Sequence, residues 1–359
     1  MESILSTGYF VHFNTNAYVQ LNQYLSNDQI STIFVLVDEN THKLCYPKFQ
    51  HKISTGKEIK VIEIKAGEIH KNITTCGTVW KKLTDLGADR KSVLINLGGG
   101  MLTDLGGFAA ATFKRGIKFI NIPTSLLSMV DASVGSKTGI DLDHLKNLIG
   151  LFSNPEMVLI DTDYLTTLPE REMRSGVAEV IKYGLTFSPA LLKDIKNDNW
   201  KNISNLNDII FQSVEIKNNV VLQDPKEENL RKVLNYGHTI GHAIESYYLE
   251  QNSLENLTHG EAIAIGMVIE GYLSYKLLDF PITELDSLKA YVHKTYGRTI
   301  ISPEYYENII QLMKHDKKNK KGTIYYILLN DIADFIIDSK APTTLVVEGL
   351  DYYNTKLQA

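Results

Sequence analysis

The spacing of hydrophobic and polar positions along the chain changes near residue 166. Before that point, short apolar runs rich in β-branched residues predict five strands, at 32–37, 61–64, 92–97, 118–122 and 156–161. A stretch with helical spacing at 72–87 separates two of these runs. Such alternation is typical of βαβ units around a mostly parallel sheet. The pattern therefore predicts a parallel-sheet domain over residues 1–166.

After residue 166 the period of the pattern becomes helical. Long amphipathic stretches predict helices at 172–186, 206–222, 237–250 and 259–278. Near residue 323 the segment "TIYYILL" interrupts this pattern and predicts a pair of strands. We expect a mostly helical second domain over residues 167–359.

Length and charge limit the classes of function. The chain has 359 residues, of which 43% are hydrophobic, and a formal net charge of −5. These values predict a globular protein of two domains that binds neither nucleic acid nor a membrane surface. Its apolar runs fall short of the ~18 residues of a membrane span, and its first residues lack the features of a signal peptide. Cys45 and Cys76 have no metal-ligand spacing, so we expect reduced thiols and a cytoplasmic protein.

A glycine-rich turn follows the third predicted strand. The segment "NLGGGMLTDLGGFAAA" begins at Asn96, and Gly98, Gly99 and Gly100 open what has the composition of a helix. Glycines let a phosphate approach backbone N–H groups at a helix start. The turn thus indicates a pyrophosphate site, although it differs from the G-x-G-x-x-G pattern. A tight turn packed under the sheet is the alternative.

A long polar connection follows the fourth predicted strand. Residues 122–150 are dense in Gly, Ser, Thr, Asp and Lys, whereas connections in α/β domains usually take about 2–6 residues. We interpret this stretch as a functional loop rather than a spacer. Asp131, Lys137, Lys146 and Asn147 are its candidate site residues. A solvated surface loop is the alternative.

The segment "NYGHTIGHAIE" carries His238 and His242, which share one face of a helix at i and i+4. Arg231 and Asn235 extend this stripe if the helix continues across Gly237; otherwise the helix starts at the glycine.

Two further stretches offer partners for these histidines. Thr258 and Glu261 have capping-box spacing, which places His259 in a first helical turn. Glu179 and Lys182 share a helical face in a mostly apolar segment, where the alternative is an exposed ion pair of little consequence. Two imidazoles and a carboxylate form a familiar catalytic zinc site. Glu179, His238, His242 and His259 are four candidates for its three places.

Basic residues gather in these unusual stretches although the chain is acidic overall. Such a concentration of cations predicts a site for a multiply charged anion. The residues are Arg115, Lys137, Lys146, Lys182, Lys217 and Arg231, with Lys317 in the run "HDKKNKKG".

Taken together, these stretches resemble the 3-dehydroquinate synthase family of the sugar-phosphate cyclase group. The matching segments keep their order and spacing over nearly the whole chain: "GGGMLTDLGGF", "RGIKFINIPTSLL", "VDASVGSKTGID", "KNLIGLF", "TLPERE", "SGVAEVIKYG", "LNYGHTIGHAIE", "HGEAIAIGM" and "DKK". The resemblance implies a Rossmann-like N-terminal domain, a helical C-terminal domain and an active site between them. It also implies bound NAD and one divalent metal, zinc or cobalt. We further expect a homodimer.

The resemblance assigns roles residue by residue. It implies that Glu179, His238 and His259 bind the metal while His242 acts on protons. The other implied catalytic residues are Asp131, Lys137, Asn147, Lys182, Lys217, Arg231 and Asn235. The implied contacts to the substrate phosphate are Arg115, Lys146 and Lys317. The implied NAD contacts are Asp38, Asn40, Glu68, Lys71, Gly99, Gly100, Asp104, Thr124, Ser125, Thr167 and Glu172.

The implied reaction converts 3-deoxy-D-arabino-heptulosonate 7-phosphate to 3-dehydroquinate and phosphate in the shikimate pathway of aromatic amino acid biosynthesis. It proceeds by transient oxidation with NAD, phosphate elimination, reduction, ring opening and aldol closure. The chain departs from the family at Ser125, where Thr is usual, and at Ser136 and Leu145, where Gly is usual. Where the family usually has Gly, we expect Leu145 to add bulk to the phosphate-binding loop.

Three alternatives are retained. Another sugar-phosphate cyclase is disfavoured because the chain keeps the segment from Val134 to Ile140 that its cousins tend to lose. A metal-dependent polyol dehydrogenase would share the glycine turn but would need fewer cations. A non-catalytic metabolite-binding protein would have no use for an intact set of metal, proton and phosphate residues.

Overall fold

The protein is described from a computed structural model that covers residues 1–142, 145–197, 205–251, 254–314 and 323–356. It divides into two compact units: Met1–Pro169 with Ile210–Pro225, and Glu170–Ile209 with Lys226–Ala359. Residues 210–225 therefore cluster with the first unit, although the sequence assigns them to the second domain. The boundary at residue 166 stays a prediction. Among the described helices, none combines the length and apolar character needed to cross a bilayer.

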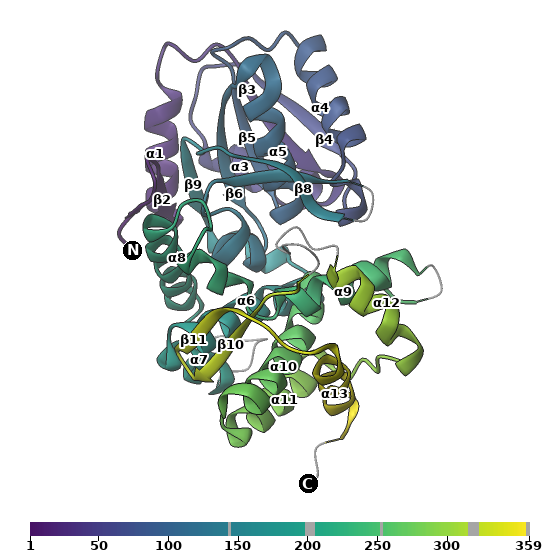
Figure 1. Ribbon diagram of the computed structural model, residues 1–359. Helices are drawn as coiled ribbons and strands as arrows, with labels where there is room; N and C mark the ends of the chain where they lie inside the picture. Colours follow the sequence, from purple (N-terminus) through teal and green to yellow (C-terminus); the bar gives the residue numbers. More distant parts are fainter. Residues whose placement is uncertain (143–144, 198–204, 252–253, 315–322, 357–359) are drawn as a thin grey trace. The chain divides into compact units, whose positions relative to one another are not determined.

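A seven-stranded sheet forms the centre of the first unit (Figure 1). Its strands lie in the order β1-β2-β9-β6-β5-β3-β4, and all neighbours are parallel except β1 and β2. They span Ile4–Leu5 (β1), Phe10–Phe13 (β2), Ile33–Asp38 (β3), Ile59–Ile64 (β4), Val93–Gly98 (β5), Lys118–Pro123 (β6) and Met157–Ile160 (β9). The five predicted strands are confirmed. β3 and β5 are buried along their whole length, as expected of parallel strands covered on both faces.

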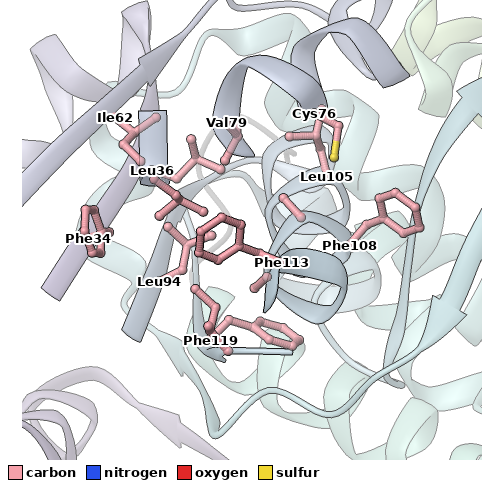
Figure 2. Packing of buried hydrophobic residues seen from close by; sticks show 14 of the residues in the cluster. Phe34, Leu36, Ile62, Cys76, Val79, Leu94, Leu105, Phe108, Phe113 and Phe119 are labelled. Atoms are coloured by element: carbon pink, nitrogen blue, oxygen red, sulfur yellow. The ribbon is translucent and has the colours of Figure 1, made fainter. Parts of the chain in front are cut away.

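Helices connect these strands and cover the sheet. They are Asn14–Leu25 (α1), Glu39–Leu44 (α2), Tyr46–Lys52 (α3), Ile73–Asp85 (α4) and Gly100–Thr112 (α5), with short helical segments at Glu68–His70, Phe113–Arg115, Ser128–Ala132 and Thr162–Thr167. Helix α8 (Leu206–Gln223) belongs to this unit from Ile210 onward. Figure 2 shows the core that α4 and α5 form with the strands, where Val79 and Leu105 lie near Leu36 and Leu94. The predicted helix at 72–87 is confirmed as α4.

The direction of strand succession reverses between β3 and β5. From β3 the chain proceeds to β4 on one side, and then to β5, β6 and β9 on the other. Ligands of open parallel sheets bind at the carboxyl ends of strands beside such a reversal. Asp38 ends β3, and Gly98, Gly99 and Gly100 join β5 to α5 at this position. The glycine turn thus occupies the sheet edge where a nucleotide would be expected.

The interpretation of residues 122–150 as a loop was wrong for their second half. Residues Lys137–Leu142 (β7) and Leu145–Phe152 (β8) form an antiparallel pair, and a parallel bridge joins Asn72 to Asp141. The sequence pattern did not predict this hairpin, because the residues of β8 do not alternate between polar and apolar or between buried and exposed. Leu148, Ile149, Leu151 and Phe152 are all exposed.

The second unit is mostly helical, as predicted. Its helices are Glu170–Thr186 (α6), Pro189–Asn197 (α7), His238–Glu250 (α9), His259–Leu278 (α10), Ile282–Tyr296 (α11), Tyr306–Lys314 (α12) and Thr343–Asn354 (α13), with short 3-10 segments at Leu230–Asn235 and Pro303–Tyr305. The predicted strand pair is confirmed as Tyr326–Asp331 (β10) and Asp334–Ser339 (β11). The predicted helices at 172–186, 206–222, 237–250 and 259–278 correspond to α6, α8, α9 and α10.

Helices α9 and α10 approach each other through glycines. A Cβ atom added at Gly266 would lie 2.0 Å from the carbonyl oxygen of Gly237, so only glycine fits. Gly237 itself has a φ of +77° and immediately precedes α9, which therefore begins at His238 rather than continuing from Arg231. The close crossing brings the start of α9, with His238, against α10, which opens with His259.

Candidate functional site

Three histidine rings of the second unit face a common point. The ring centroids of His238 and His242 lie 5.1 Å apart, and that of His259 lies 5.4 Å and 5.6 Å from them. One ligand nitrogen from each of the three rings lies within 4.8 Å of the others. We call this group the histidine cluster. Its nitrogens are close enough together to share one metal ion.

The carboxylate of Glu179 on α6 lies against this cluster. Its side chain is fully buried, and its two oxygens have different surroundings. Oε2 accepts a short hydrogen bond from Nζ of Lys182, which is also buried. Oε1 lies 3.5 Å from Nε2 of His238 and 3.5 Å from Nε2 of His259. The pair of Glu179 and Lys182 is therefore not the exposed ion pair of the alternative interpretation.

Glu179 Oε1 makes no hydrogen bond within the described part of the chain, although it is buried. A buried carboxylate oxygen without a hydrogen bond is costly unless a cation compensates it. Its two separations of 3.5 Å are close to the edge of a tetrahedron with ligand bonds of about 2.1 Å, which is about 3.4 Å. The residues present therefore fit a divalent metal bound by Glu179, His238 and His259.

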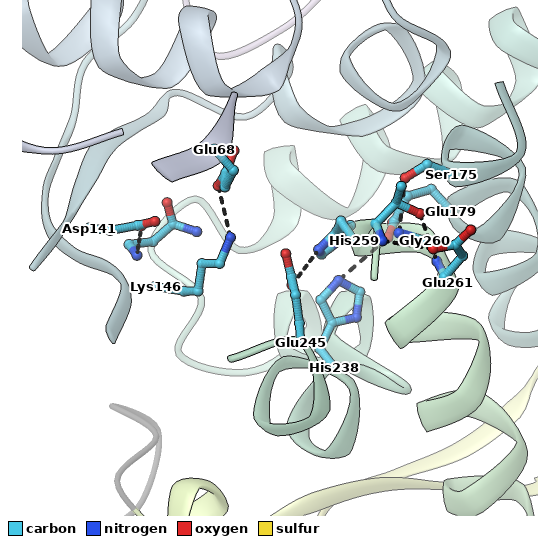
Figure 3. Close-up of polar contacts among 12 residues, drawn as sticks. Glu68, Asp141, Lys146, Ser175, Glu179, His238, Glu245, His259, Gly260 and Glu261 are labelled. Atoms are coloured by element: carbon cyan, nitrogen blue, oxygen red, sulfur yellow. Dashed lines mark hydrogen bonds and ion pairs between the residues drawn. The ribbon is translucent and has the colours of Figure 1, made fainter. Parts of the chain in front are cut away.

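The outer ring nitrogens support the same three residues. His238 donates from Nδ1 to the carbonyl oxygen of Tyr236 at 3.1 Å. Nδ1 of His259 lies 3.3 Å from Oε2 of Glu245, a contact that Figure 3 shows. Metal-binding imidazoles usually donate their second N–H to such acceptors. Burial alone would lower the pKa of His259, but the carboxylates of Glu179 and Glu245 outweigh burial and raise this pKa to about 10. The surroundings of His259 thus favour a positive charge at this point.

The first turn of α10 is fixed by three sets of contacts. The capping box predicted from Thr258 and Glu261 is present, with the N–H of Thr258 donating to Glu261 Oε2 at 2.8 Å. Arg171 of α6 donates to both oxygens of Glu261, at 2.9 and 2.8 Å. The N–H of Gly260 donates to Ser175 Oγ at 2.9 Å. These contacts hold His259 at a defined position relative to α6, which carries Glu179.

The other predicted residues of the second unit lie before α9, at the start of α6 or outside the described residues. Arg231 is buried in the 3-10 segment before α9. Asn235 donates to Oε1 of Glu227 at 2.6 Å. Glu172 is exposed in the first turn of α6. Lys317 lies outside the described residues.

In the first unit, two of the predicted NAD residues, Thr124 and Ser125, lie against the glycine turn. The N–H of Thr124, at the end of β6, donates to the carbonyl oxygen of Gly98 at 3.0 Å. Added Cβ atoms at Gly99 and Gly100 would lie 3.4 Å from Ser125 Oγ and 3.1 Å from Ala132 Cβ. Because neither glycine has a side chain, the space at the start of α5 stays open and a phosphate can approach the N–H groups there.

Two more predicted NAD contacts lie on the neighbouring strand. The carboxylate of Asp38 accepts from the N–H groups of Asn40 and Thr41, so it caps α2 at the end of β3. Asn40 is exposed at the start of that helix. Thr167 lies in the helical segment that follows β9, where it contacts the thiol of Cys45, as Thr124 also does.

A second group in this unit joins predicted cofactor residues to one predicted phosphate contact, Lys146, and one predicted catalytic residue, Asn147. Lys71 is buried and donates to Asp104 Oδ2 at 2.7 Å and to Asn147 Oδ1 at 2.6 Å. Lys146 donates to Glu68 Oε1 at 3.0 Å (Figure 3). We call Glu68, Lys71, Asp104, Lys146 and Asn147 the Lys71 cluster. Burial alone would lower the pKa of Lys71, but the surrounding carboxylates outweigh it and raise this pKa.

The remaining cations of the first unit differ in their positions. Lys217 of α8 is buried and its Nζ lies 3.0 Å from Asp131 Oδ1, so these two predicted residues are brought together. Lys137 is exposed at the start of β7. Arg115 is exposed beyond the far end of α5, about 20 Å along that helix from Gly100. The fold of this unit does not bring Arg115 to the glycine turn.

Sequence reasoning missed Glu245 and Arg171. Glu245 lies three residues after His242 and seven after His238, so the helical face it shares with them was the available signal. Arg171 belongs to the "TLPERE" segment, but nothing in its spacing indicates a contact with Glu261 of α10. Their roles depend on contacts between separate helices.

The fold and the Glu–His–His group define a class of proteins with a Rossmann-like first unit and a helical, histidine-bearing second unit. Within that class, the chain belongs to the 3-dehydroquinate synthase family. Residues 61–175 match its N-terminal domain family and residues 176–319 its C-terminal one.

Individual relatives agree with this assignment. The chain is 42% identical over 339 residues to 3-dehydroquinate synthase of Parabacteroides distasonis, which covers 93% of this chain and 94% of that protein. It is 41% identical over 305 residues to the enzyme of Pelobacter propionicus, covering 83% and 84% of the two chains.

Solved structures of similar fold include more distant enzymes. The 2-epi-5-epi-valiolone synthase of Streptomyces hygroscopicus, solved with NAD⁺ and Zn²⁺, gives a TM-score of 0.86 at 22% identity, covering 98% of each chain. A 2-deoxy-scyllo-inosose synthase complexed with carbaglucose-6-phosphate, NAD⁺ and Co²⁺ gives 0.83 at 23% identity, covering 98% and 99%. Glycerol dehydrogenase of Schizosaccharomyces pombe gives 0.63 at 16% identity, covering 98% and 90%. At these identities the similarity establishes the fold alone.

Proposed function

We propose that this chain converts 3-deoxy-D-arabino-heptulosonate 7-phosphate to 3-dehydroquinate and inorganic phosphate, a step of the shikimate pathway. The observation that carries the proposal is the Glu179 carboxylate, which is buried, bonded to Lys182 at one oxygen and directed at two imidazoles with the other. The identity of the proposed substrate follows from membership of the 3-dehydroquinate synthase family. The acidic chain nevertheless carries several buried cations, consistent with a phosphorylated substrate.

We assign NAD to the glycine turn and one divalent ion, zinc or cobalt, to Glu179, His238 and His259. The related cyclases solved with NAD⁺ and Zn²⁺ or Co²⁺ support this pairing. When bound, NAD provides a reversible hydride acceptor and the ion provides an electrophile for a substrate oxygen. We also propose that the other residues predicted to contact the cofactor bind NAD.

The chain's own residues position the substrate and move protons. Lys182 orients Glu179 through the bond to Oε2. His242 lies next to His238 and is half-buried, so it can exchange protons with a bound substrate. In the first unit, Lys146 and Asn147 are our choice for the phosphate, with Lys217 held by Asp131.

A turnover assay tests the proposal against its rivals. The protein is incubated with the heptulosonate phosphate, zinc and NAD⁺ at a small fraction of the substrate concentration. We expect dehydroquinate and phosphate in equal amounts and no net NADH, because the oxidation is reversed within each turnover. NADH accumulating in proportion to product would support the polyol dehydrogenase. No turnover with this substrate or related sugar phosphates would support a binding protein, and a different carbocycle another cyclase.

We also propose that the chain forms a homodimer through β8. This strand pairs with β7 alone among the described strands, and Leu148, Ile149, Leu151 and Phe152 are 39–55% exposed along it. An apolar strand with an open edge is a template for pairing with another chain. A second copy offers the same strand, so the pairing would be symmetric.

A cytoplasmic location remains part of the proposal. Cys45 and Cys76 are buried and unpaired, as expected of thiols in a reducing compartment.

A further inference from the structure

His238 and His259, whose Nε2 atoms lie 3.5 Å from Glu179 Oε1, have different partners at their Nδ1 atoms. His238 donates to a backbone carbonyl, which the fold of the Tyr236–Gly237 turn holds in place. His259 instead faces Glu245, whose side chain is 8% exposed and whose Oε2 lies 3.3 Å from Nδ1. Of these two partners, only the Glu245 carboxylate can carry a charge.

The position of Glu245 follows from α9. It lies seven residues after His238, two helical turns along the same face, and extends toward the first turn of α10 (Figure 3). Burial of a carboxylate is costly unless a charged or hydrogen-bonding partner compensates it. His259 supplies such a partner.

We propose that Glu245 is a positioning residue for the metal site. Its carboxylate accepts the Nδ1–H of His259, which fixes the tautomer and turns Nε2 toward Glu179 Oε1. The inference rests on the metal-binding residues of the proposed function and adds a residue that acts through one of them.

The backbone of His259 does not depend on Glu245. The start of α10 is held by Thr258, Glu261 and Arg171, and Gly260 is bonded to Ser175. Glu245 therefore governs the orientation and basicity of the ring rather than the place of the helix. This separation allows a positioning role to be distinguished from a structural one.

The test is the Glu245→Gln variant, which keeps the shape of the side chain but loses the charge. Affinity for Zn²⁺ and Co²⁺ is measured on the chelator-treated full chain by competition with a chromophoric chelator. We expect a 10- to 100-fold weaker affinity, the range typical of lost outer partners of metal ligands. The visible absorption spectrum of the Co²⁺-loaded protein should also change, because a neutral partner makes the His259 ring a weaker electron donor and so alters the ligand field.

Two further variants complete the experiment. Glu250→Gln makes the same substitution at the exposed end of α9 and should leave both readouts unchanged. Glu245→Asp keeps the charge but withdraws it by about 1.5 Å, so its affinity should fall between those of the wild type and the Gln variant. If Glu245→Gln does not fold, the metal affinity and the Co²⁺ spectrum of Glu245→Asp test the inference instead.

Wild-type affinity and an unchanged Co²⁺ spectrum in the Glu245 variants would overturn the inference. The same result would leave the proposed function intact, since the wild-type protein would still bind metal and form dehydroquinate. Failure of the wild-type chain to bind either metal would instead refute the metal-binding part of the proposed function.

Discussion

Gly260 provides the most direct test of how the second unit places its metal-binding residues. A Cβ added at this residue would lie 2.2 Å from the carbonyl oxygen of Ser175, 2.4 Å from its Cα and 2.6 Å from its carbonyl carbon. All three are backbone atoms of α6, so no change of rotamer relieves the overlap. Ordinary contacts of this kind are about 3.5 Å long, and α10 would have to withdraw by about 1 Å.

The free energy of unfolding should fall accordingly in Gly260→Ala. Overpacking of a rigid contact costs about 1–3 kcal/mol, and the lost bond from the Gly260 N–H to Ser175 Oγ adds about 1 kcal/mol. We expect a loss of about 2–4 kcal/mol and a weaker affinity for Zn²⁺, because α6 carries Glu179 and α10 carries His259. Urea unfolding followed by far-ultraviolet circular dichroism measures the first quantity, and chelator competition the second.

Gly77→Ala is the matched control. Gly77 lies inside α4, and a Cβ there would meet no atom within 4 Å. Replacing a helical glycine by alanine in open space should stabilise the protein by about 0.5–1 kcal/mol. The two substitutions should therefore have opposite signs. If Gly260→Ala unfolded at the wild-type urea concentration and bound Zn²⁺ equally well, the packing of α10 on α6 would not be what holds the two ligands together.

Two other predictions concern the ligand set and the assembly. His238→Ala should retain less than a tenth of the wild-type affinity for Zn²⁺, whereas His242→Ala should bind Zn²⁺ nearly normally and lose turnover; equal metal loss in both would favour a site of three histidines. Phe152→Asp on β8 should shift the protein toward monomers in sedimentation analysis, while Ile336→Asp on β11 should not, and a wild-type protein that sediments as a monomer would refute the dimer.

Much of the fold could be predicted from the sequence because its elements have strong local patterns. The strands of the first unit are continuous apolar runs, and β3 and β5 prove to be buried at every position. The helices of the second unit have a clear 3.6-residue period. The capping box of α10 was also predictable, since Thr258 and Glu261 interact within one turn.

Features that depend on contacts between distant segments could not be predicted in the same way. β8 is exposed on both faces, so it lacks the alternation that identifies a half-buried strand. Helical periodicity identified α8 but not the unit against which it packs. Ser136 has a φ of +64°, a conformation that favours the glycine usual in the family, and its hydroxyl donates to Asn154 Oδ1 at 2.5 Å. That compensating bond joins residues 18 positions apart.

In the candidate site, too, local sequence patterns predicted some features, whereas others depend on contacts between distant segments. Motif spacing offered Glu179, His238, His242 and His259 for three places, and only the resemblance to the family excluded His242. The structure supplies a physical basis for the choice in the two oxygens of Glu179, one bonded to Lys182 and the other 3.5 Å from two ring nitrogens. No sequence pattern records which oxygen of a carboxylate is already bonded.

In the first unit, the Lys71 cluster also contains contacts that the sequence did not predict. The sequence assigned Glu68, Lys71 and Asp104 to the cofactor, and Lys146 and Asn147 to the substrate. In the structure, two hydrogen bonds connect these groups, from Lys71 to Asn147 and from Lys146 to Glu68. A phosphate bound by Lys146 would compete with Glu68 for the same ammonium group. We therefore expect binding of phosphate and the position of Glu68 to be coupled, because the phosphate would bring negative charge next to this carboxylate.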